Sequence, residues 1–218
     1  MADRKNTRKN SRSKSKAGSR EAQVRRNIIL GLVGVLAALT ACIACVGYVL
    51  LNRRAPLGIS DAVEAYRPKV EQYAKEEGVP EYVDYLLAIM EVETGGAGKD
   101  VMQSSESLGL PRNTLDTDES IQQGCRYLAE NLARAEKLGC DTLSAVQAYN
   151  FGIDYLDFVA ERGGVQSIEV AEEFAKNKSG GEKTRYVNSV SLDYNGGYRY
   201  KFGNMFYAEL VRRLVENM

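Results

Sequence analysis

Residues 88–108 have the sequence Ala-Ile-Met-Glu-Val-Glu-Thr-Gly-Gly-Ala-Gly-Lys-Asp-Val-Met-Gln-Ser-Ser-Glu-Ser-Leu. The stretch begins as the end of an apolar helix and breaks at Gly95 and Gly96, because glycine readily adopts the backbone conformations that end helices. A polar loop with carboxylates, an amide and hydroxyl groups follows at once. Glu93 and Asp100 lie on either side of the break. We therefore expect the chemistry of this protein at the end of this helix.

Glu93 is predicted to lie at the edge of the apolar face of that helix. On a helical wheel it falls beside Leu86, whereas Glu91 falls beside Asp84 on the solvent side. Burial and the partial negative charge of a helix C-terminus both raise the pKa of a carboxyl group. A protonated carboxyl group is what cleavage of a glycosidic bond needs at the leaving oxygen. Asp100 is then a candidate second carboxylate, although a surface glutamate and an ordinary loop aspartate would give the same pattern.

The chain beyond residue 60 is predicted to be mainly α-helical. Prolines and capping residues mark the helix starts, and glycines mark the ends. The expected helices span residues 68–78, 80–94, 116–137, 141–149, 153–162, 168–177, 182–192 and 206–215. The pattern of Ala62, Val63 and Tyr66 leaves an earlier helix open. Tyr198, Tyr200 and Phe202 alternate along the chain, which favours a short strand or an extended aromatic segment. Stacking on sugars is one role for these rings, and packing in the core is the other.

Histidine is absent from the sequence, and this excludes several kinds of site. Ser-His-Asp triads, Cys-His pairs and histidine-rich zinc sites all need an imidazole. We expect carboxylate chemistry without a metal or a cofactor. Cys125 and Cys140 are predicted to be unpaired thiols, because an intervening helix would separate them beyond the reach of a disulfide.

The N-terminal region combines a basic segment with an apolar one. Residues 1–26 contain ten lysines and arginines against two acids, and we expect a disordered cytoplasmic tail. Residues 27–51 contain no charged residue and are long enough for a transmembrane helix. The basic excess before this span predicts a cytoplasmic N-terminus and an extracellular C-terminal domain in a single-pass membrane protein. Residues 52–64 are predicted to be a linker, and residues 65–218 the folded domain.

Three motifs resemble a known family. Residues 89–96 and 99–107 look like the signature of the lysozyme-like muramidase domain in Gram-positive cell-wall hydrolases, many of which are carried by conjugative elements. The stretch is also similar, more distantly, to lytic transglycosylases and goose-type lysozyme. Residues 148–152, Ala-Tyr-Asn-Phe-Gly, resemble a second motif of those enzymes. Residues 182–187, Glu-Lys-Thr-Arg-Tyr-Val, resemble a third, with a departure at Lys183.

The resemblance implies a helical lysozyme-like fold with a glycan cleft. By motif position, Glu93 would be the general acid and Asp100 the assisting carboxylate. The implied substrate-binding residues are Gln103, Ser104, Ser105, Tyr149 and Asn150. Of these, Tyr149 would form a hydrogen bond near the catalytic carboxyl group, and Asn150 would support the site or contact the substrate. Other roles stay open: Tyr149 can be a core aromatic, and Ser105 and Glu106 can be the cap and the first-turn acid of a helix. Many members also carry a Cys-His peptidase domain, which we do not expect without histidine.

These observations predict a membrane-anchored N-acetylmuramidase. It would cleave the β-1,4 bond between N-acetylmuramic acid and N-acetylglucosamine in peptidoglycan, and open the wall locally for a conjugation or secretion apparatus. One alternative is a lytic transglycosylase that leaves 1,6-anhydro ends, and another is a non-catalytic wall-binding scaffold. We expect no nucleic-acid partner, because from residue 55 onward about 27 acidic residues face roughly 17 basic ones.

Overall fold

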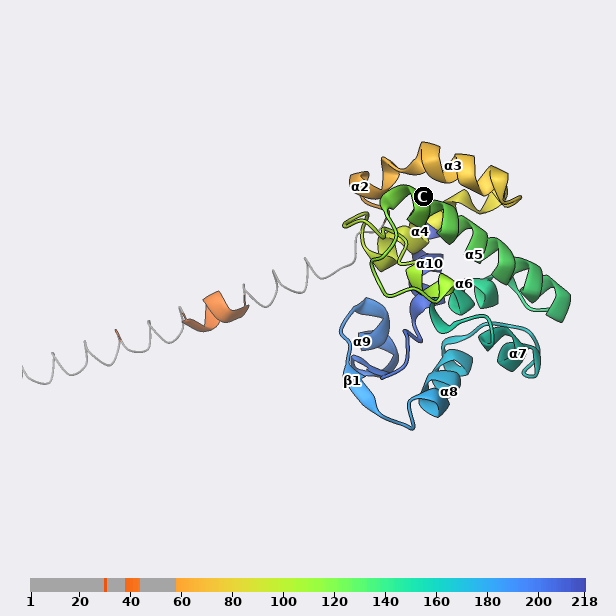
Figure 1. The fold of residues 1–218 in the computed structure, drawn as a ribbon. Helices are drawn as coiled ribbons and strands as arrows, with labels where there is room; N and C mark the ends of the chain where they lie inside the picture. Colours follow the sequence, from red (N-terminus) through yellow and green to blue (C-terminus); the bar gives the residue numbers. More distant parts are fainter. Residues whose placement is uncertain (1–29, 31–37, 44–57) are drawn as a thin grey trace, which may run out of the picture. The chain divides into compact units, whose positions relative to one another are not determined.

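Figure 1 shows the fold in a computed structural model, which describes residue 30, residues 38–43 and residues 58–218. The chain divides into two compact units, Met1–Arg53 and Arg54–Met218. In the first unit, residues 38–43 are helical. The predicted tail and most of the predicted span 27–51 lie outside the described residues. Within the described part, no helix combines the length and the apolar character that a membrane crossing needs.

The second unit is mainly helical, as predicted, with one short antiparallel sheet. Thr184 on one strand pairs with Arg199 on the other. In chain order the elements are α2 (Asp61–Glu64), α3 (Arg67–Glu76), η1 (Pro80–Tyr82), α4 (Val83–Glu93), η2 (Ser105–Leu108), α5 (Thr117–Leu138), α6 (Thr142–Phe151), α7 (Tyr155–Ala160), α8 (Ile168–Lys178), β1 (Lys183–Arg185), α9 (Ser189–Asn195), β2 (Tyr198–Tyr200) and α10 (Tyr207–Val215).

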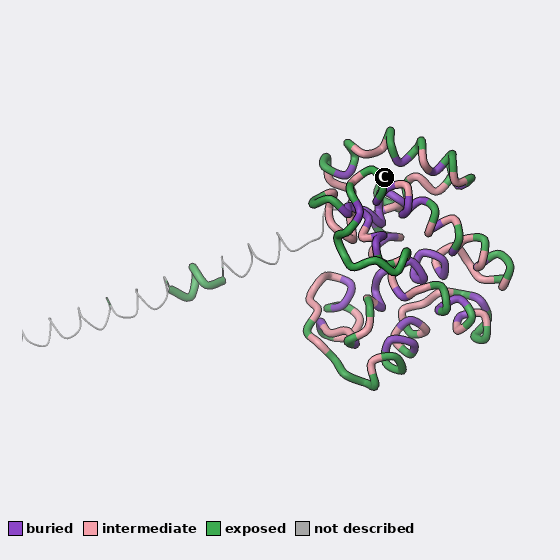
Figure 2. The backbone as a smooth tube through the Cα atoms, viewed as in Figure 1, coloured by how far each residue is buried: buried purple, intermediate pink, exposed green. Residues whose placement is uncertain are grey.

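Helix α4 lies at the centre of the larger of two apolar clusters. Its residues 86–90 are all buried, and the cluster continues through α3, α5, α6 and α10. The smaller cluster joins α6 to α7, α8 and the start of α10. Figure 2 shows the buried residues along the inner faces of these helices and exposed residues on the outer turns of α3 and α5. Because α4 is surrounded by other helices, its last residue is held in a fixed position.

The predicted helix caps are confirmed at three positions. Asp116 accepts from the backbone N–H of Glu119 and begins α5 with a reciprocal capping box. Asp141 and Ser167 cap α6 and α8 in the same way, through side chains that accept backbone N–H groups. Gly139 ends α5 in the left-handed conformation, with φ of 71°.

Three local predictions need correction. Residues 182–192 are not one helix: β1 and α9 share this stretch, because β1 pairs with β2 and Asn188 caps a new helix. Helix α2 lies within the predicted linker, at the position where an earlier helix was left open, and its buried Val63 joins the larger apolar cluster. Glu91 is not a solvated charge, because its Oε2 accepts from the backbone N and the Oγ of Ser60 at 2.9 and 2.8 Å. Because Ser60 is the N-cap of α2, these hydrogen bonds link helix α2 to helix α4.

The cysteine and aromatic predictions are confirmed for the described residues. Cys125 and Cys140 are both free thiols. The side chain of Tyr200 is buried, and the ring of Phe202 packs against Phe151 and Phe174 at centroid distances of 5.5 and 5.7 Å. These two rings therefore belong to the core.

Candidate active site

Glu93 ends helix α4, and its side chain is partly buried beside the apolar core. Tyr207, at the start of α10, donates its hydroxyl to Glu93 Oε1 at 2.7 Å. Directly after the helix, Thr94 donates its Oγ1 to the carbonyl of Val101 at 2.6 Å. Gly96 follows with φ of 76°, and a Cβ there would lie 3.2 Å from the backbone of Ala62. The break after Glu93 is therefore built into the packing.

The electrostatics of Glu93 match those of a general acid. Burial raises the pKa of Glu93 to about 7, although the hydrogen bond from Tyr207 and the charge of Arg112 act to lower it. The negative charges of Asp100 and Glu106 reinforce the rise. Burial and the neighbouring Glu93 raise the pKa of Tyr207 well above 10, so its hydroxyl stays protonated and remains a donor. At neutral pH a substantial fraction of Glu93 carries a proton.

Asp100 lies under the loop and is only 1% exposed. Its Oδ1 accepts from the Ser104 backbone N and the Ser120 Oγ at 2.9 and 2.7 Å. Its Oδ2 accepts from the backbone N and the Oγ of Ser105 at 3.3 and 2.5 Å. Burial raises the pKa of Asp100, but these hydrogen bonds outweigh it and leave the pKa below the ordinary value. Both oxygens are occupied by protein donors, so this placement does not suit the assisting carboxylate that the resemblance implied.

Ser105 is also part of the buried hydrogen-bond network around Asp100. It is 0% exposed, and its Oγ accepts from the backbone N of Thr114 and of Leu115, both at 3.1 Å, while it donates to Asp100. The side chain therefore ties two segments of the loop together. It does not line the cleft as the resemblance implied, and its neighbour Ser104 is the N-cap of η2.

Gln103 and Ser104 do line the cleft. Gln103 has φ of 47°, and its Nε2 donates to the Asp100 carbonyl at 3.1 Å and to Asn113 Oδ1 at 2.8 Å. Ser104 donates its Oγ to the carbonyl of Ser120 at 2.9 Å. The loop is thus fixed by its own hydrogen bonds before any substrate binds.

Tyr149 and Asn150, near the end of α6, also line the cleft. Tyr149 is 7% exposed and donates its hydroxyl to the carbonyl of Met102 at 3.1 Å, so it holds the loop instead of the carboxyl group of Glu93. Its ring lies parallel to that of Tyr207, with centroids 6.5 Å apart. Asn150 Oδ1 accepts from the backbone N of Asn204 at 2.6 Å. Both residues are at the site: Tyr149 contacts the loop, and Asn150 has the supporting contact that was one of its two suggested roles.

The cleft has a volume of about 260 Å³ and includes residues that the sequence did not single out. Its lining comprises Glu93, Gln103, Ser104, Glu106, Ser107, Arg112, Tyr127, Tyr149, Asn150, Phe151 and Gly152. Glu106 is the second carboxylate in this lining, and Arg112 Nε lies 3.2 Å from its Oε2. Tyr207 was also missed, because it is 114 positions from Glu93 and its place on the apolar face of an amphipathic helix is typical of core packing.

Gly124 on α5 explains how close the loop comes to the helix. A Cβ at this position would lie 2.5 Å from Met102 Sδ and 2.9 Å from the Tyr149 hydroxyl. A lone glycine inside an amphipathic helix was the signal that could have revealed this close approach.

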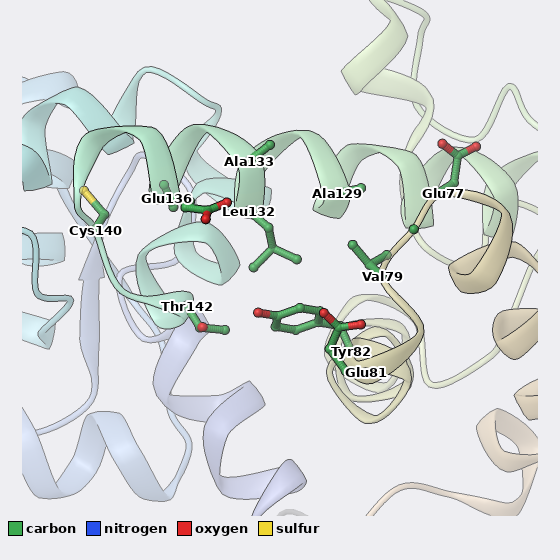
Figure 3. A pocket seen from close by; sticks show the side chains of 12 residues that line it. Glu77, Val79, Glu81, Tyr82, Ala129, Leu132, Ala133, Glu136, Cys140 and Thr142 are labelled. Carbon is green, nitrogen blue, oxygen red and sulfur yellow. The ribbon is translucent and has the colours of Figure 1, made fainter.

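A separate groove of about 550 Å³ lies between α5 and η1. Figure 3 shows Leu132 of α5 pointing toward Tyr82, with Glu77 at one end of the groove and Cys140 at the other. None of the sequence-predicted site residues line it. Among the residues that the structure describes, no group of histidine, cysteine, aspartate or glutamate side chains could hold a metal ion.

Comparison with protein families gives a match to the lysozyme-like family model over residues 60–215. The pneumococcal vaccine antigen A homolog of Streptococcus pyogenes serotype M1 is 39% identical over 158 residues, which cover 68% of this chain and 79% of that protein. The bifunctional muramidase/DL-endopeptidase CwlT of Bacillus subtilis is 38% identical over 121 residues. That match covers 55% of this chain and 36% of CwlT.

Among solved structures, the chain is similar to an NLP/P60-family, lipoprotein-like protein of Staphylococcus aureus subsp. aureus Mu50. The TM-score is 0.71 and the sequence identity is 50%. The likeness covers 72% of this chain and 54% of the staphylococcal chain, so this chain spans about half of that protein.

Proposed function

The chain belongs to the lysozyme-like family, and from this premise we propose that it is a membrane-anchored N-acetylmuramidase. The substrate is the β-1,4 bond between N-acetylmuramic acid and N-acetylglucosamine in peptidoglycan. The observation that carries the proposal is Glu93, a partly buried carboxyl group in a cleft, with its pKa raised to about 7. The muramidase named among the relatives adds support.

In the first step, protonated Glu93 donates its proton to the oxygen that leaves with N-acetylglucosamine. The bond from that oxygen to C1 of muramic acid breaks, and positive charge develops on the sugar ring. Tyr207 keeps its hydrogen bond to Oε1 and stabilises the carboxylate that forms. In the second step this carboxylate takes a proton from water as the water oxygen bonds to C1.

Glu106 takes the place that the sequence gave to Asp100. It lines the cleft with Glu93, and its ion pair with Arg112 is exposed and weak, so it can face the sugar ring or orient water. Asp100 is a positioning residue: it holds Ser104 and Ser105, and through them the loop that carries Glu106.

The alternative reaction uses the 6-hydroxyl of the same muramic acid in place of water. Glu93 would again protonate the leaving oxygen and then accept the proton from this hydroxyl, leaving a 1,6-anhydro end. One observation favours this route. Both carboxylate oxygens of Asp100 already accept hydrogen bonds from protein groups, so Asp100 is not available to position a water molecule.

Mass spectrometry of the fragments tests the proposal. Purified full-length chain is incubated with peptidoglycan, and the muropeptides are compared with those from the Glu93→Gln variant. We expect new reducing N-acetylmuramic acid ends with wild type and none with the variant. Detection of 1,6-anhydro ends would instead identify the enzyme as a lytic transglycosylase. Binding without cleavage by both proteins would identify a non-catalytic wall-binding scaffold.

We further propose that residues 27–51 anchor the chain with its N-terminus in the cytoplasm and the lysozyme-like domain outside. The support is the uncharged apolar run and the basic residues before it. Tethering would confine cleavage to glycan strands near the membrane, as suits local wall opening by a conjugation or secretion apparatus. A secreted chain of residues 54–218 tests this role: it should lyse cells more generally than the tethered form, and equal lysis would contradict it.

A further inference from the structure

A second pocket, of about 520 Å³, adjoins the cleft. Arg112 and Asn150 line both hollows, so the two are continuous at these residues. The remaining lining comprises Thr184, Tyr186, Arg199, Lys201, Gly203 and Asn204. Three of the eight lining residues carry positive charge and none is acidic, although the domain as a whole is acidic. We call this hollow the basic pocket.

The β1–β2 hairpin explains why the charges gather there. Thr184 lies opposite Arg199 in the register, and side chains two apart on a strand share a face. Pairing continues one residue beyond β2, because the Lys201 backbone N donates to the carbonyl of Glu182 at 2.8 Å. Arg199 and Lys201 therefore point to one face, toward the basic pocket. Arg185 alternates with Thr184 and points to the other face.

Arg199 is held in place but is not neutralised by its neighbours. Its Nη1 donates to the carbonyls of Gly203 and Tyr200, and its Cζ lies 5.3 Å from the centre of the Tyr186 ring. Its Nε is buried and has no hydrogen-bond partner. Among the described residues, no ion pair involves Arg199. A buried N–H of a guanidinium group without a partner is costly unless a ligand supplies the acceptor.

The other two cations can also serve a ligand. Lys201 pairs with Glu182 at 3.0 Å, and Arg112 pairs with Glu106 at 3.2 Å. All four side chains are more than half exposed. Ion pairs of this kind contribute little, so a ligand can displace them at small cost.

We propose that the basic pocket binds an anionic substituent of muramic acid next to the bond that Glu93 protonates. This inference rests on the proposed function. In peptidoglycan, muramic acid carries a peptide stem with free carboxylates, and in many walls a polymer linked through a phosphodiester. Both sources present oxygens that arginine and lysine bind through charge-assisted hydrogen bonds. The enzyme would thus select substituted glycan over bare glycan.

The test compares kcat/KM of the full-length chain on three forms of one wall. The first has its native stems and phosphate polymer, the second has had its stem carboxylates converted to neutral amides with carbodiimide and ammonia, and the third has lost its polymer to hydrofluoric acid. We expect wild type to prefer the first form by about threefold to tenfold over the form that lacks the recognised anion. A lower kcat/KM after amidation identifies the stem carboxylates as the recognised anion, and a lower kcat/KM after hydrofluoric acid treatment identifies the phosphate.

Variants locate the preference in the basic pocket. Arg199→Gln and Lys201→Gln should each reduce the ratio of kcat/KM between the first form and the form that lacks the recognised anion, and Arg199→Lys should retain part of this ratio. Arg185→Gln is the matched control, since it removes the same charge from the other face of the hairpin. A ratio is unaffected by the fraction of folded protein.

Two results would overturn the inference. Wild type could cleave all three forms equally, or Arg185→Gln could lower the ratio as much as Lys201→Gln, which would indicate general charge attraction. Absence of cleavage of every form by wild type is a different failure: it refutes the proposed function, and the inference falls with it.

Discussion

Glu93 and Asp100 are two shielded carboxyl groups seven positions apart, and their environments drive them to opposite states. Glu93 stands at the end of α4 against the apolar core, where burial raises its pKa to about 7. Asp100 is more deeply buried, at 1% exposure, yet its pKa is lowered. Among the described residues, Tyr207 alone donates to Glu93, whereas Asp100 accepts from two hydroxyls and two backbone N–H groups.

The difference shows that burial alone does not decide the charge of a carboxyl group. Several donors aimed at the charged form can offset the loss of solvation, and one donor does not. The chain thus keeps one carboxyl group able to carry a proton for chemistry and a second one ionised for structure. The following variants alter each environment in turn.

The largest effect is expected for Glu93→Gln. The amide cannot donate the proton, so kcat should fall by about 10²–10⁴-fold. The folded-state pKa of Glu93 lies above its unfolded value of 4.5, so its stabilising contribution is complete below pH 4.5 and lost as pH rises through 7. The variant should therefore be more stable than wild type at pH 8, by about 1–2 kcal/mol, with a smaller gain at pH 5. Urea unfolding of both proteins at pH 5 and pH 8 measures this difference in the free energy of unfolding.

Asp100→Asn should reduce stability most. The side-chain NH₂ of the new asparagine would face hydroxyl and N–H groups that already donate to this position. We expect this clash of donors to lower the free energy of unfolding by about 3 kcal/mol at pH 7. Because the folded-state pKa of Asp100 is lowered, wild type holds this advantage above the unfolded value of 3.8 and loses it as pH falls through the folded value. Activity should fall with the integrity of the loop.

Glu106→Gln is the matched control for that loop. The Glu106 side chain is exposed, so the free energy of unfolding should change by less than about 0.5 kcal/mol. Its kcat should fall nonetheless, because it lines the cleft. If Asp100→Asn loses activity at unchanged stability, Asp100 acts on the substrate directly and the positioning role is wrong.

Tyr207→Phe should give the smallest change. Its hydroxyl lowers the pKa of Glu93, so removing it should raise that pKa by about one unit. A general acid works while protonated, and the alkaline limb of the kcat profile should move to higher pH. Tyr149→Phe is the control, because Tyr149 donates to a backbone carbonyl instead. An equal shift in both variants would contradict the assignment.

Local patterns in the sequence predicted the features that depend on neighbouring residues. The caps at Asp116 and Asp141, the break after Glu93 and its position at the edge of an apolar face all follow from spacing within a few turns. The partner of Glu93 could not be predicted, because the chain brings Tyr207 to it across 114 positions. The hairpin was missed because pairing with β2 overrides the helical preference of residues 182–185.

The hydrogen bonds of Asp100 could not be predicted for a similar reason. Its sequence position beside Glu93 suggested a shared cleft, but the donor from α5, Ser120, is 20 positions away. Only the packed structure shows that both oxygens of Asp100 are already satisfied. Proximity in sequence therefore identified the two carboxyl groups but did not distinguish their environments.

Direct titration of the two carboxyl groups tests the central claim. In the chain labelled with ¹³C at side-chain carboxyl carbons, NMR follows each resonance with pH, and Glu93→Gln and Asp100→Asn assign them. The account predicts that Glu93 titrates near 7 while Asp100 stays ionised to below its ordinary pKa of 3.8. A Glu93 that titrates near 4.5, with Asp100 as the group of raised pKa, would contradict it.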